Sequence, residues 1–344
     1  MPLILVTGAC GFIGSHTVVQ LLTEGFDVLS IDNFDNSYPE TYDRITKITG
    51  KKVKHLNIDL CNLQDLEWIL KDTIVDAIIH FASLKSVPES VEMPLLYYGK
   101  NLNSLINLLY CVKKFKIPHF IFSSSCAVYG NPPDKLPKAD FVVNEGTSLQ
   151  EVESPYASTK VMCERILKDF MKTTKDTSAI SLRYFNPVGA HESGMLGENA
   201  KSKVNNNLVS VITQSAKTDK VVKVFGNDYP TRDGTCIRDY VHVMDISNAH
   251  ILALKYLIIP SGSGGSYDVF NLGTGNGVSV LETIKAFEKV TGKKLKYEMG
   301  PRRAGDIIAI TSDSKKAKDL LGWEPKYGIE EMVESAWKWE QYKQ

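Results

Sequence analysis

The sequence predicts an α/β fold with a doubly wound parallel sheet in its first half and a smaller C-terminal α/β domain in its second. Three observations support this prediction. Short apolar runs alternate with amphipathic stretches through the first half of the chain. A glycine-rich segment joins the first apolar run to the first amphipathic stretch. Beyond Tyr184 the alternation gives way to longer loops rich in Gly, Asn and Asp.

The first half contains strand and helix patterns in strict alternation. Five short runs are apolar enough to be strands buried on both faces: Leu3–Thr7, Asp27–Ile31, Lys52–Leu56, Ala77–His80 and His119–Ser123. Helical periodicity covers Phe12–Thr23, Leu63–Leu70 and Tyr97–Lys114, and a further helix is expected from Ser154-Pro155 to about Met171, before a strand at Ala179–Arg183. Such strand–helix–strand repetition predicts a parallel sheet with helices on both faces.

The second half is predicted to contain shorter elements between two loops, Asn186–Asn207 and Gly226–Thr235. Helices are expected at Val241–Tyr256, Val278–Thr291 and Glu330–Trp339, and a strand at Asp268–Asn271 is expected to return to the first domain. We therefore expect residues 1–184 and about 237–271 to form the first domain, and residues 185–236 and about 272–344 to form the second.

Composition excludes several classes of partner. The 40 basic and 40 acidic residues of the 344-residue chain cancel without long runs of one sign, so neither a nucleic acid nor a membrane surface is expected as a partner. The six cysteines are scattered without metal-ligand spacing, which predicts no metal site. The apolar run at residues 3–6 is too short for a signal peptide, and the chain lacks Asn-x-Ser/Thr. Free thiols and a cytoplasmic location are expected.

Gly8, Gly11 and Gly14 have the spacing GxxGxxG, directly after the first predicted strand and at the start of the first helix. Glycines at such a junction permit a tight turn and a close approach of the backbone, and the helix N-terminus then faces a pyrophosphate. A glycine triplet by itself could be an ordinary turn. Its place between a strand and a helix favours a dinucleotide site in a Rossmann-type sheet.

Asp32 ends the second predicted strand. A carboxylate at this place can accept hydrogen bonds from both adenosine ribose hydroxyls and would repel the additional phosphate of NADP, and no arginine follows closely, so NAD is the expected cofactor. The alternative is a solvated aspartate at a strand end. Asp59, after the third strand, could hold the adenine amino group, although such a residue is also an ordinary loop or N-cap aspartate.

Tyr156 and Lys160 are four residues apart and therefore share one face of a helix. A lysine ammonium beside a phenol, together with a positive nicotinamide, would stabilise the phenolate and lower the tyrosine pKa. Tyrosine and lysine at this spacing also occur together by chance on protein surfaces. Ser123-Ser124-Ser125 end a predicted strand, where open α/β sheets bind ligands, and this favours a catalytic group of Ser125, Tyr156 and Lys160.

Six longer motifs resemble those of the UDP-glucose (UDP-galactose) 4-epimerase family, in the extended short-chain dehydrogenase/reductase superfamily. The resemblance covers essentially the whole chain, in order. These motifs are Phe81-Ala82-Ser83-Leu84-Lys85, Ser123-Ser124-Ser125-Cys126-Ala127-Val128-Tyr129-Gly130, Arg183-Tyr184-Phe185-Asn186-Pro187-Val188-Gly189-Ala190-His191, Phe225-Gly226-Asn227-Asp228-Tyr229-Pro230-Thr231, Arg238-Asp239-Tyr240-Val241-His242-Val243 and Pro301-Arg302-Arg303-Ala304-Gly305-Asp306.

The resemblance implies inversion at C4 of a UDP-hexose through a transient 4-keto sugar, with bound NAD in the first domain and the UDP-sugar in the second. It implies that Tyr156 is the base, Ser125 an adjoining hydroxyl and Lys160 the anchor of the nicotinamide ribose. Cofactor contacts are implied for Gly8, Gly11, Phe12, Ile13, Gly14, Asp32, Asn33, Asn36, Ser37, Asp59, Leu60, Phe81, Ala82, Lys85, Ser123, Tyr156, Lys160, Tyr184 and Phe185. Substrate contacts are implied for Lys85, Ser125, Tyr156, Asn186, Asn207, Leu208, Lys223, Val224, Phe225, Arg238, Arg303, Asp306 and Ile310.

Several of these roles also have a physical basis or an alternative. A diphosphate buried in a cleft needs arginines for bidentate pairing, and Asp306 can accept from ribose hydroxyls. The alternatives are surface salt bridges for the arginines and a role in turns for the asparagines. Ile310, four residues after Asp306, would limit space beside the sugar C2 substituent and favour UDP-glucose and UDP-galactose over N-acetylhexosamines, unless it is a core residue of a short strand. The resemblance also implies a homodimer formed through a helix pair, with Tyr97–Lys114 and Val161–Met171 as candidates.

The chain departs from the family pattern at two places. Cys126-Ala127 replace the usual Ala-Thr, which leaves Ser125 and Tyr156 as the proton path. The segment between Gly130 and Tyr156 is long and contains Glu145, Glu151 and Glu153. A nucleotide-sugar 4,6-dehydratase is the nearest alternative, but its relatives have Asp-Glu where this chain has Cys126-Ala127. A non-catalytic NAD-sensing regulator would tend to lose the tyrosine or the lysine, and this chain retains both.

Overall fold

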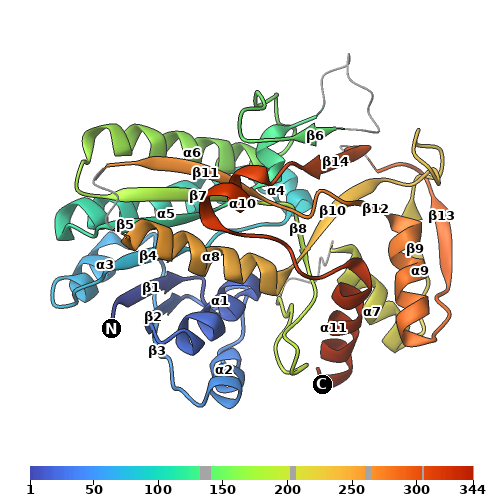
Figure 1. Cartoon of the computed structure of the whole chain (residues 1–344), viewed down its shortest axis with the longest axis horizontal. Coiled ribbons are helices and arrows are strands. Elements are labelled where there is room, and N and C mark those ends of the chain that lie inside the picture. The colour runs from blue at the N-terminus through green and yellow to red at the C-terminus, as the bar shows by residue number, and fades with distance from the viewer. Residues whose placement is uncertain (132–140, 202–206, 260–264, 304–305, 344) are drawn as a thin grey trace.

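A seven-stranded sheet forms the centre of the first part of the molecule in the computed structural model, which describes residues 1–131, 141–201, 207–259, 265–303 and 306–343 (Figure 1). The strand order is β11-β7-β5-β4-β1-β2-β3, and each neighbouring pair is parallel. The strands are β1 (Leu3–Thr7), β2 (Asp27–Asp32), β3 (Lys54–Asn57), β4 (Ala77–His80), β5 (His119–Ser125), β7 (Ser178–Tyr184) and β11 (Tyr267–Leu272). The order reverses between β1 and β4, where open α/β sheets bind their ligands.

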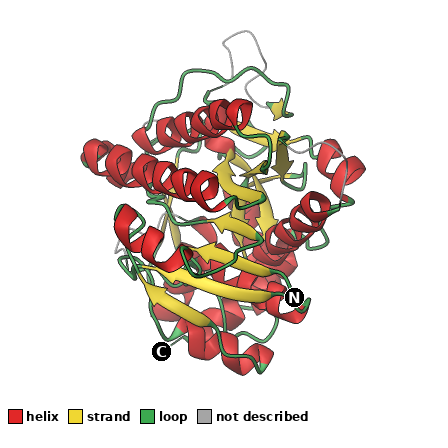
Figure 2. Cartoon of the chain, turned by 90° about the vertical axis from the view of Figure 1, so that its left-hand side faces the viewer, coloured by secondary structure: helices red, strands yellow, loops and turns green. Residues whose placement is uncertain are grey.

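Helices cover both faces of this sheet (Figure 2). Alternate residues of β1 explain why: Ile4 and Val6 pack into a core with α1 (Phe12–Thr23) and α8 (Val243–Ile258), whereas Leu5 packs into the opposite core. That second core includes residues of α3 (Leu63–Leu70), α5 (Pro94–Phe115) and α6 (Pro155–Thr173). Because both faces are covered, the inner strands β1, β2, β4, β5 and β7 are almost entirely buried, as the sequence predicts. The prediction was wrong for β3, whose residues are exposed or half-buried because it is the edge strand of the sheet.

The second part of the molecule has smaller sheets, on the right in Figure 1. A five-stranded sheet has the order β12-β10-β14-β6 with β8 beside β10, and a two-stranded sheet joins β13 and β9. The strands are β6 (Val142–Val143), β8 (Asn186–Val188), β9 (Val222–Phe225), β10 (Ile237–His242), β12 (Gly277–Ser279), β13 (Tyr297–Gly300) and β14 (Ala309–Ser312). The helices α7 (Leu208–Thr218), α9 (Val280–Thr291) and α11 (Ile329–Tyr342) share one core, where the Phe287 and Trp337 rings meet edge to face at 5.5 Å.

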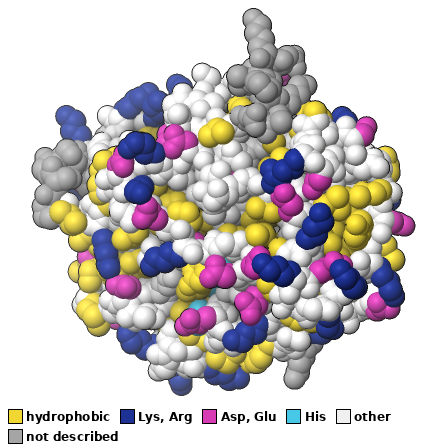
Figure 3. All heavy atoms as spheres, turned by 45° about the vertical axis from the view of Figure 1, so that its right-hand side comes forward, with side chains coloured by type: hydrophobic (Ala, Val, Ile, Leu, Met, Phe, Trp, Pro, Cys, Tyr) yellow, Lys and Arg dark blue, Asp and Glu magenta, His cyan; other side chains and the backbone are white. Residues whose placement is uncertain are grey.

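Four short helical segments complete the described structure: α2 (Thr41–Thr49), α4 (Val87–Glu92), the 3-10 segment η1 (Cys126–Tyr129) and α10 (Lys315–Leu321). On the face in Figure 3, basic and acidic side chains are interspersed, without a patch of one sign. In the described ranges, the structure contains no helix with both the length and the apolar character of a membrane span.

The doubly wound parallel sheet predicted from the sequence is confirmed, and so is the return of β11 to it beside β7. The prediction was wrong at short strands in the second half of the chain, which lie in segments that were predicted to be helix or loop. The helix expected from Val241 begins at Val243, because residues 237–242 form β10; the helix expected from Val278 begins at Val280, after β12; and the loop expected from Asn186 contains β8. β10 pairs within the second sheet while α8 packs on α1, so the exact domain boundaries stay a prediction.

Candidate active site

The glycine-rich loop lies between β1 and α1 and packs tightly against its surroundings. Gly8 has φ +66, and a Cβ there would lie 2.6 Å from the amide nitrogen of Ala82, after β4. A Cβ on Gly14 would lie 2.3 Å from the Gly8 carbonyl oxygen, so both positions require glycine. Gly11 is the N-cap of α1 and offers no side-chain acceptor to the first-turn amides. These amides can therefore receive an anionic group at the positive end of the helix.

Asp32 connects the end of β2 to this loop and is only 8% exposed, so it is not a solvated strand-end residue. Its Oδ2 accepts from the amide of Cys10 at 2.9 Å. Its Oδ1 accepts from the amide of Phe34 at 2.9 Å and from the Ser37 hydroxyl at 2.8 Å. The carboxylate is thereby fixed beside the glycine loop, as a ribose-binding residue would have to be.

The other residues expected around an adenosine are on the loops after β2 and β3. The Asp59 carboxylate accepts from the amide of Cys61 at 2.9 Å and pairs with Lys100, so it also has the ordinary loop role. The Asn33 amide donates to Asp35 Oδ2 at 2.6 Å. Lys201, from the second half of the chain, donates to the Phe34 carbonyl oxygen at 2.7 Å. Segments far apart in sequence therefore meet at this edge of the sheet.

Tyr156 and Lys160 occupy the first two turns of α6, which is capped by Ser154. Lys160 Nζ donates to the carbonyl oxygen of Ser123 at 2.8 Å, and lies 5.9 Å from the centre of the Tyr156 ring. Ser125 ends β5, and its hydroxyl accepts from the amide of Ala127 at 3.1 Å. The structure thus brings the three predicted catalytic residues to the carboxyl edge of the parallel sheet.

Burial dominates the titration of this group. It raises the pKa of Tyr156 to about 12, and hydrogen bonding with Ser125 opposes the increase. It lowers the pKa of Lys160 to about 8, opposed by Cys163 and Glu164. The groups of the chain alone therefore do not lower the Tyr156 pKa toward neutrality; a positive charge bound beside the phenol would have to contribute.

A buried polar network lies directly behind these residues, and the sequence reasoning missed it. Glu164 Oε1 accepts from the Ser124 hydroxyl at 2.5 Å, and both Glu164 oxygens accept from Arg183, at 2.9 and 2.7 Å. Arg183 also donates to the Tyr129 hydroxyl at 2.9 Å, which donates to Asn271 Oδ1 at 2.6 Å. The only sequence signal for this network was the spacing of Glu164, four residues after Lys160 on the same helix face.

The same network explains part of the acidic stretch that the sequence left without a role. Glu145 Oε1 accepts from the backbone amide of Asn271 at 2.7 Å, and the Asn271 side chain donates to the Val143 carbonyl oxygen at 3.1 Å. Glu153 accepts from the side chain of Asn131. Glu145 therefore attaches the segment before α6 to β11 of the main sheet.

Four charged residues expected to hold UDP, Lys223, Arg238, Arg303 and Asp306, lie together in the second part of the molecule. Asp306 Oδ1 accepts from Arg303 at 2.8 Å and from Arg238 at 3.5 Å. Arg238 is the second residue of β10, half-buried, and also donates to the Ile307 carbonyl oxygen at 2.5 Å. The guanidinium of Arg303 lies 5.5 Å from the Phe225 ring, and Lys223 Nζ lies 5.8 Å from it. Three cationic side chains, an aromatic ring and a carboxylate are suited to a nucleoside diphosphate.

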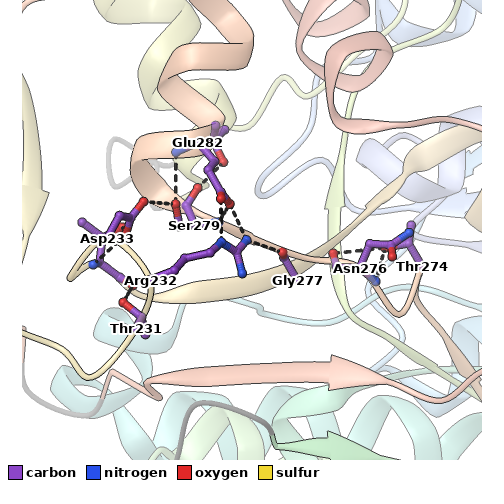
Figure 4. A network of polar contacts seen from close by, with 10 residues as sticks. Thr231, Arg232, Asp233, Thr274, Asn276, Gly277, Ser279 and Glu282 are labelled. Carbon is purple, nitrogen blue, oxygen red and sulfur yellow. Dashed lines mark hydrogen bonds and ion pairs between the residues drawn. The ribbon is translucent and has the colours of Figure 1, made fainter.

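The loop between β9 and β10 is bonded to the start of α9 (Figure 4). The Arg232 guanidinium pairs with both oxygens of Glu282 and donates to the Gly277 carbonyl oxygen at 2.7 Å. Asp233 accepts from the hydroxyl of Ser279, the N-cap of α9. The loop that the sequence predicted is therefore bonded to β12 and the start of α9 before the chain enters β10.

Lys85 and Asn207 were both expected to contact the substrate. In this structure both bind other groups of the protein, and Glu198 lies beside each of them. Lys85 Nζ pairs with Glu198 Oε1 at 2.7 Å, and Glu198 Oε2 accepts from the Ser210 hydroxyl at 2.6 Å. The Asn207 side chain donates to the Pro187 carbonyl oxygen at 2.9 Å. Glu198, Asn207 and Phe12 line one small pocket, which places a glycine-loop neighbour beside a predicted substrate residue. Glu198 was missed by the sequence reasoning.

Ile310 lies opposite Arg238 in the β10–β14 pair and is 2% exposed. It packs in a small cluster with Phe185, Val128 and Tyr129, which Cys126 borders. Ile310 is therefore a core residue of a short strand, which was the alternative to a role beside the sugar. The cluster includes residues of η1 and lies at the end of β7. The role of Ile310 beside a sugar stays a prediction. Tyr184, also buried, bonds through its hydroxyl to His250 Nε2 at 2.6 Å.

Fold and site together define a class: an extended short-chain dehydrogenase/reductase, with a glycine-rich dinucleotide loop and a Ser–Tyr–Lys group at the carboxyl edge of the sheet. The sequence profile of the GDP-mannose 4,6 dehydratase family matches residues 5–336.

Full-length relatives narrow the class. The UDP-glucose 4-epimerase of Bacillus subtilis (strain 168) is 43% identical over 339 residues, covering 98% of this chain and 96% of that protein. The UDP-glucose 4-epimerase of Pisum sativum is 46% identical over 341 residues, covering 98% and 95%. The crystal structure of UDP-glucose 4-epimerase from Bifidobacterium longum in complex with NAD+ and UDP is 42% identical with a TM-score of 0.92, covering 99% and 98%. This chain belongs to the UDP-glucose 4-epimerase family.

Proposed function

We propose that this chain is an NAD-dependent UDP-glucose 4-epimerase, which interconverts UDP-galactose and UDP-glucose by inverting C4 of the sugar. One observation supports the proposal most strongly. Tyr156 and Lys160 of α6 meet Ser125 at the carboxyl end of β5. Only β4 separates β5 from β1, whose carboxyl end carries the glycine loop, and Asp32 ends β2 on the other side of β1. The relatives named above carry this activity in their names and align over nearly the whole chain.

The residues present fit NAD. Gly8 and Gly14 sit where a Cβ would collide with backbone, so the loop retains the close packing that a pyrophosphate cradle needs. Asp32 offers carboxylate oxygens at the end of β2, where ribose hydroxyls would be bound and a 2′-phosphate would be repelled. Lys160 would hold the nicotinamide ribose. Bound NAD would supply the acceptor of the C4 hydride and, in the return step, its donor.

Tyr156 then performs the proton transfers. Its phenolate, directly or through the Ser125 hydroxyl, takes the proton of the sugar C4 hydroxyl and later returns it. Burial raises the pKa of Tyr156 although Lys160 Nζ lies 5.9 Å from the centre of its ring. The positive nicotinamide of oxidised NAD would therefore favour the phenolate. Arg238, Arg303 and Asp306 would hold UDP while the 4-keto sugar turns over, so that remote binding retains a mobile intermediate.

The 4,6-dehydratase alternative, which shares the matched profile, requires an additional acid and base after the strand-end hydroxyl. Cys126 occupies that place in η1, and burial raises the pKa of its thiol to about 12, while Ala127 has no ionisable group. Neither residue can expel a C6 hydroxyl. A non-catalytic NAD-sensing role is disfavoured by the complete Ser125–Tyr156–Lys160 group.

A single incubation tests the proposal. Purified protein is mixed with UDP-galactose without added cofactor, and formation of UDP-glucose is measured. Separately, denatured protein is analysed for released nucleotide, which is expected to be NAD. Absence of UDP-glucose formation in protein that retains NAD would refute the epimerase assignment, and NADP as the main released nucleotide would refute the cofactor.

We also propose a homodimer and a cytoplasmic place in galactose metabolism. The helices α5 and α6 pack side by side and expose large apolar side chains, including Leu95, Tyr110 and Met162. A paired helix face could cover these residues in a second copy. The six cysteines are free thiols, which suits a reducing compartment. Light scattering at low concentration, with Tyr110→Glu as the variant, measures the assembly.

A further inference from the structure

Asp239 is a completely buried carboxylate in β10, and the proton path proposed above does not use it. Its Oδ2 accepts from the amide and the hydroxyl of Ser312, at 2.9 and 2.8 Å, and from the amide of Gly275 at 3.0 Å. Its Oδ1 accepts from the amide and the hydroxyl of Thr274, at 2.8 and 2.7 Å. All five partners are donors, so the carboxylate is fully satisfied without a cation.

These five bonds join three segments of the chain. Thr274 and Gly275 belong to the turn after β11, an edge strand of the main sheet, and Figure 4 shows Thr274 next to Asn276 in this turn. Ser312 ends β14, which pairs with β10 in the second sheet. Gly273 permits the approach, because a Cβ there would lie 2.4 Å from the Ser312 hydroxyl and 2.5 Å from Asp239 Oδ2.

Arg238, the preceding residue, depends on the segment that Asp239 holds. Neighbouring side chains of a strand point to opposite faces, so Asp239 faces its donors while Arg238 faces the predicted UDP site. The Arg238 guanidinium is held by the Ile307 carbonyl oxygen at 2.5 Å and by Asp306 at 3.5 Å, both just before β14. Asp239 is bonded to Ser312 at the other end of that strand, so it fixes the distance between β10 and β14.

We propose that Asp239 is a positioning residue for substrate binding, which holds β10 against β14 so that Arg238 and Asp306 are placed to bind the diphosphate and ribose of UDP. This inference rests on the proposed function and adds a determinant of its nucleotide site. It assigns Asp239 an effect on UDP affinity and on the substrate KM, with little effect on the chemical step at Tyr156.

Asparagine is nearly isosteric with aspartate but cannot satisfy this environment. In either orientation of the amide, its NH2 group faces backbone N–H donors: that of Thr274 in one, those of Gly275 and Ser312 in the other. Buried donors left unpaired destabilise this contact, so β14 is expected to move away from β10. Gly273→Ala would displace the same contact from the other side, by steric overlap with Asp239 Oδ2 and Ser312.

Asp245→Asn is the matched control. Asp245 is also a buried carboxylate, 2% exposed, that accepts from backbone amides, those of Lys326 and Tyr327 at 3.0 and 3.3 Å. It lies in α8 and packs against the segment before α11, with no bond in the described structure to Arg238, Arg303 or Asp306. It therefore reports the effect of losing a buried carboxylate clamp without moving the predicted UDP residues.

The experiment measures UDP binding by calorimetry, together with bound NAD, kcat, KM and thermal unfolding, for wild type and the three variants. Asp239→Asn and Gly273→Ala are expected to weaken UDP binding about 10-fold and raise KM similarly, with kcat within about threefold of wild type and NAD retained. Asp245→Asn is expected to lower Tm without changing UDP affinity. Unchanged UDP affinity in folded Asp239→Asn would overturn the proposal; if that variant does not fold, unchanged affinity in Gly273→Ala would do so.

Loss of kcat at unchanged UDP affinity would also overturn it, because Asp239 would then act on the chemistry. If wild-type protein binds UDP but does not epimerise UDP-galactose, the proposed function fails, while the UDP affinities of the variants still decide the role of Asp239.

Discussion

Lys160 Nζ donates to the carbonyl oxygen of Ser123 at 2.8 Å. This bond holds the ammonium against the end of β5, where Ser125 is two residues further along, and Tyr156 is one turn earlier on α6. β5 and α6 thereby present hydroxyl, phenol and ammonium in one place. Because the bond uses a backbone carbonyl, its geometry depends on the strand and helix and not on a further side chain.

Tyr156→Phe is expected to lower kcat by about 10²–10⁴-fold while NAD content and thermal unfolding stay near wild type, because a positioned acid/base is removed without a change in shape. Tyr256→Phe, at an exposed position of α8, is the matched control and should retain full activity. A Tyr156→Phe variant that keeps more than about a tenth of wild-type kcat would remove this residue from the mechanism.

Lys160 gives a prediction on stability and pH. Its folded-state pKa is about 8, below the ordinary value of 10.5, so the ammonium destabilises the folded state below pH 8 and this effect disappears as pH rises to 10.5. Lys160→Met should therefore stabilise the cofactor-free protein relative to wild type at pH 7 by up to about 3 kcal/mol, and by much less at pH 10. Urea unfolding at the two pH values measures this; an equal difference at both would contradict the lowered pKa.

Glu164→Gln breaks the buried pair with Arg183, whose side chains are 8% and 6% exposed. The expected loss of stability is about 3–5 kcal/mol, because a buried guanidinium loses its counter-charge. The amide NH2 replaces one of the two oxygens that accept from Arg183 and Ser124, so the network must rearrange next to Ser125 and kcat should also fall. Asp169→Asn, which breaks the exposed Arg165–Asp169 pair on the same helix, should cost at most about 1 kcal/mol. Equal effects of the two variants would show that the network is not structural.

Arg238→Leu and Arg303→Leu should weaken UDP binding by roughly 2–5 kcal/mol if the diphosphate is buried against them, because truncation leaves phosphate charge unpaired. The effect of Arg238 should be the larger, because its side chain is 18% exposed and that of Arg303 46%. Arg165→Leu is the control for an exposed arginine. If calorimetry finds UDP affinity unchanged in both variants, Arg238 and Arg303 do not contact UDP and the substrate binds elsewhere.

Ile310→Ala tests sugar size. If Ile310 limits the pocket, the ratio of kcat/KM for UDP-galactose to that for UDP-N-acetylgalactosamine should fall in the variant. Burial of Ile310 means that the substitution also costs about 2–5 kcal/mol of stability. Ile284→Ala, in the core of the second part, has the same loss of volume away from the site and should leave the ratio unchanged. Equal ratios in wild type and Ile310→Ala would show that Ile310 is only a core residue.

The sequence determined the main sheet and the place of its site, because both depend on local patterns. The apolar strands and the 3.6-residue periodicity of α1, α3, α5 and α6 follow from burial on two faces, and the glycines at 8, 11 and 14 follow from backbone conformation and close packing. Tyr156 and Lys160 were detectable because helix geometry alone brings residues four apart together.

Tertiary structure decided what depends on segments distant in sequence. β8 and β12 have three residues each and β14 has four, which gives little periodic signal, whereas the six residues of β10 run directly into α8. These segments form strands because they pair around β10. The partners of Glu164, Arg183 and Asp239 come from other strands and turns, so no spacing along the chain predicted their bonds. Burial likewise set the Tyr156 and Lys160 pKa values, because desolvation depends on everything packed around a group and not on its neighbours in sequence.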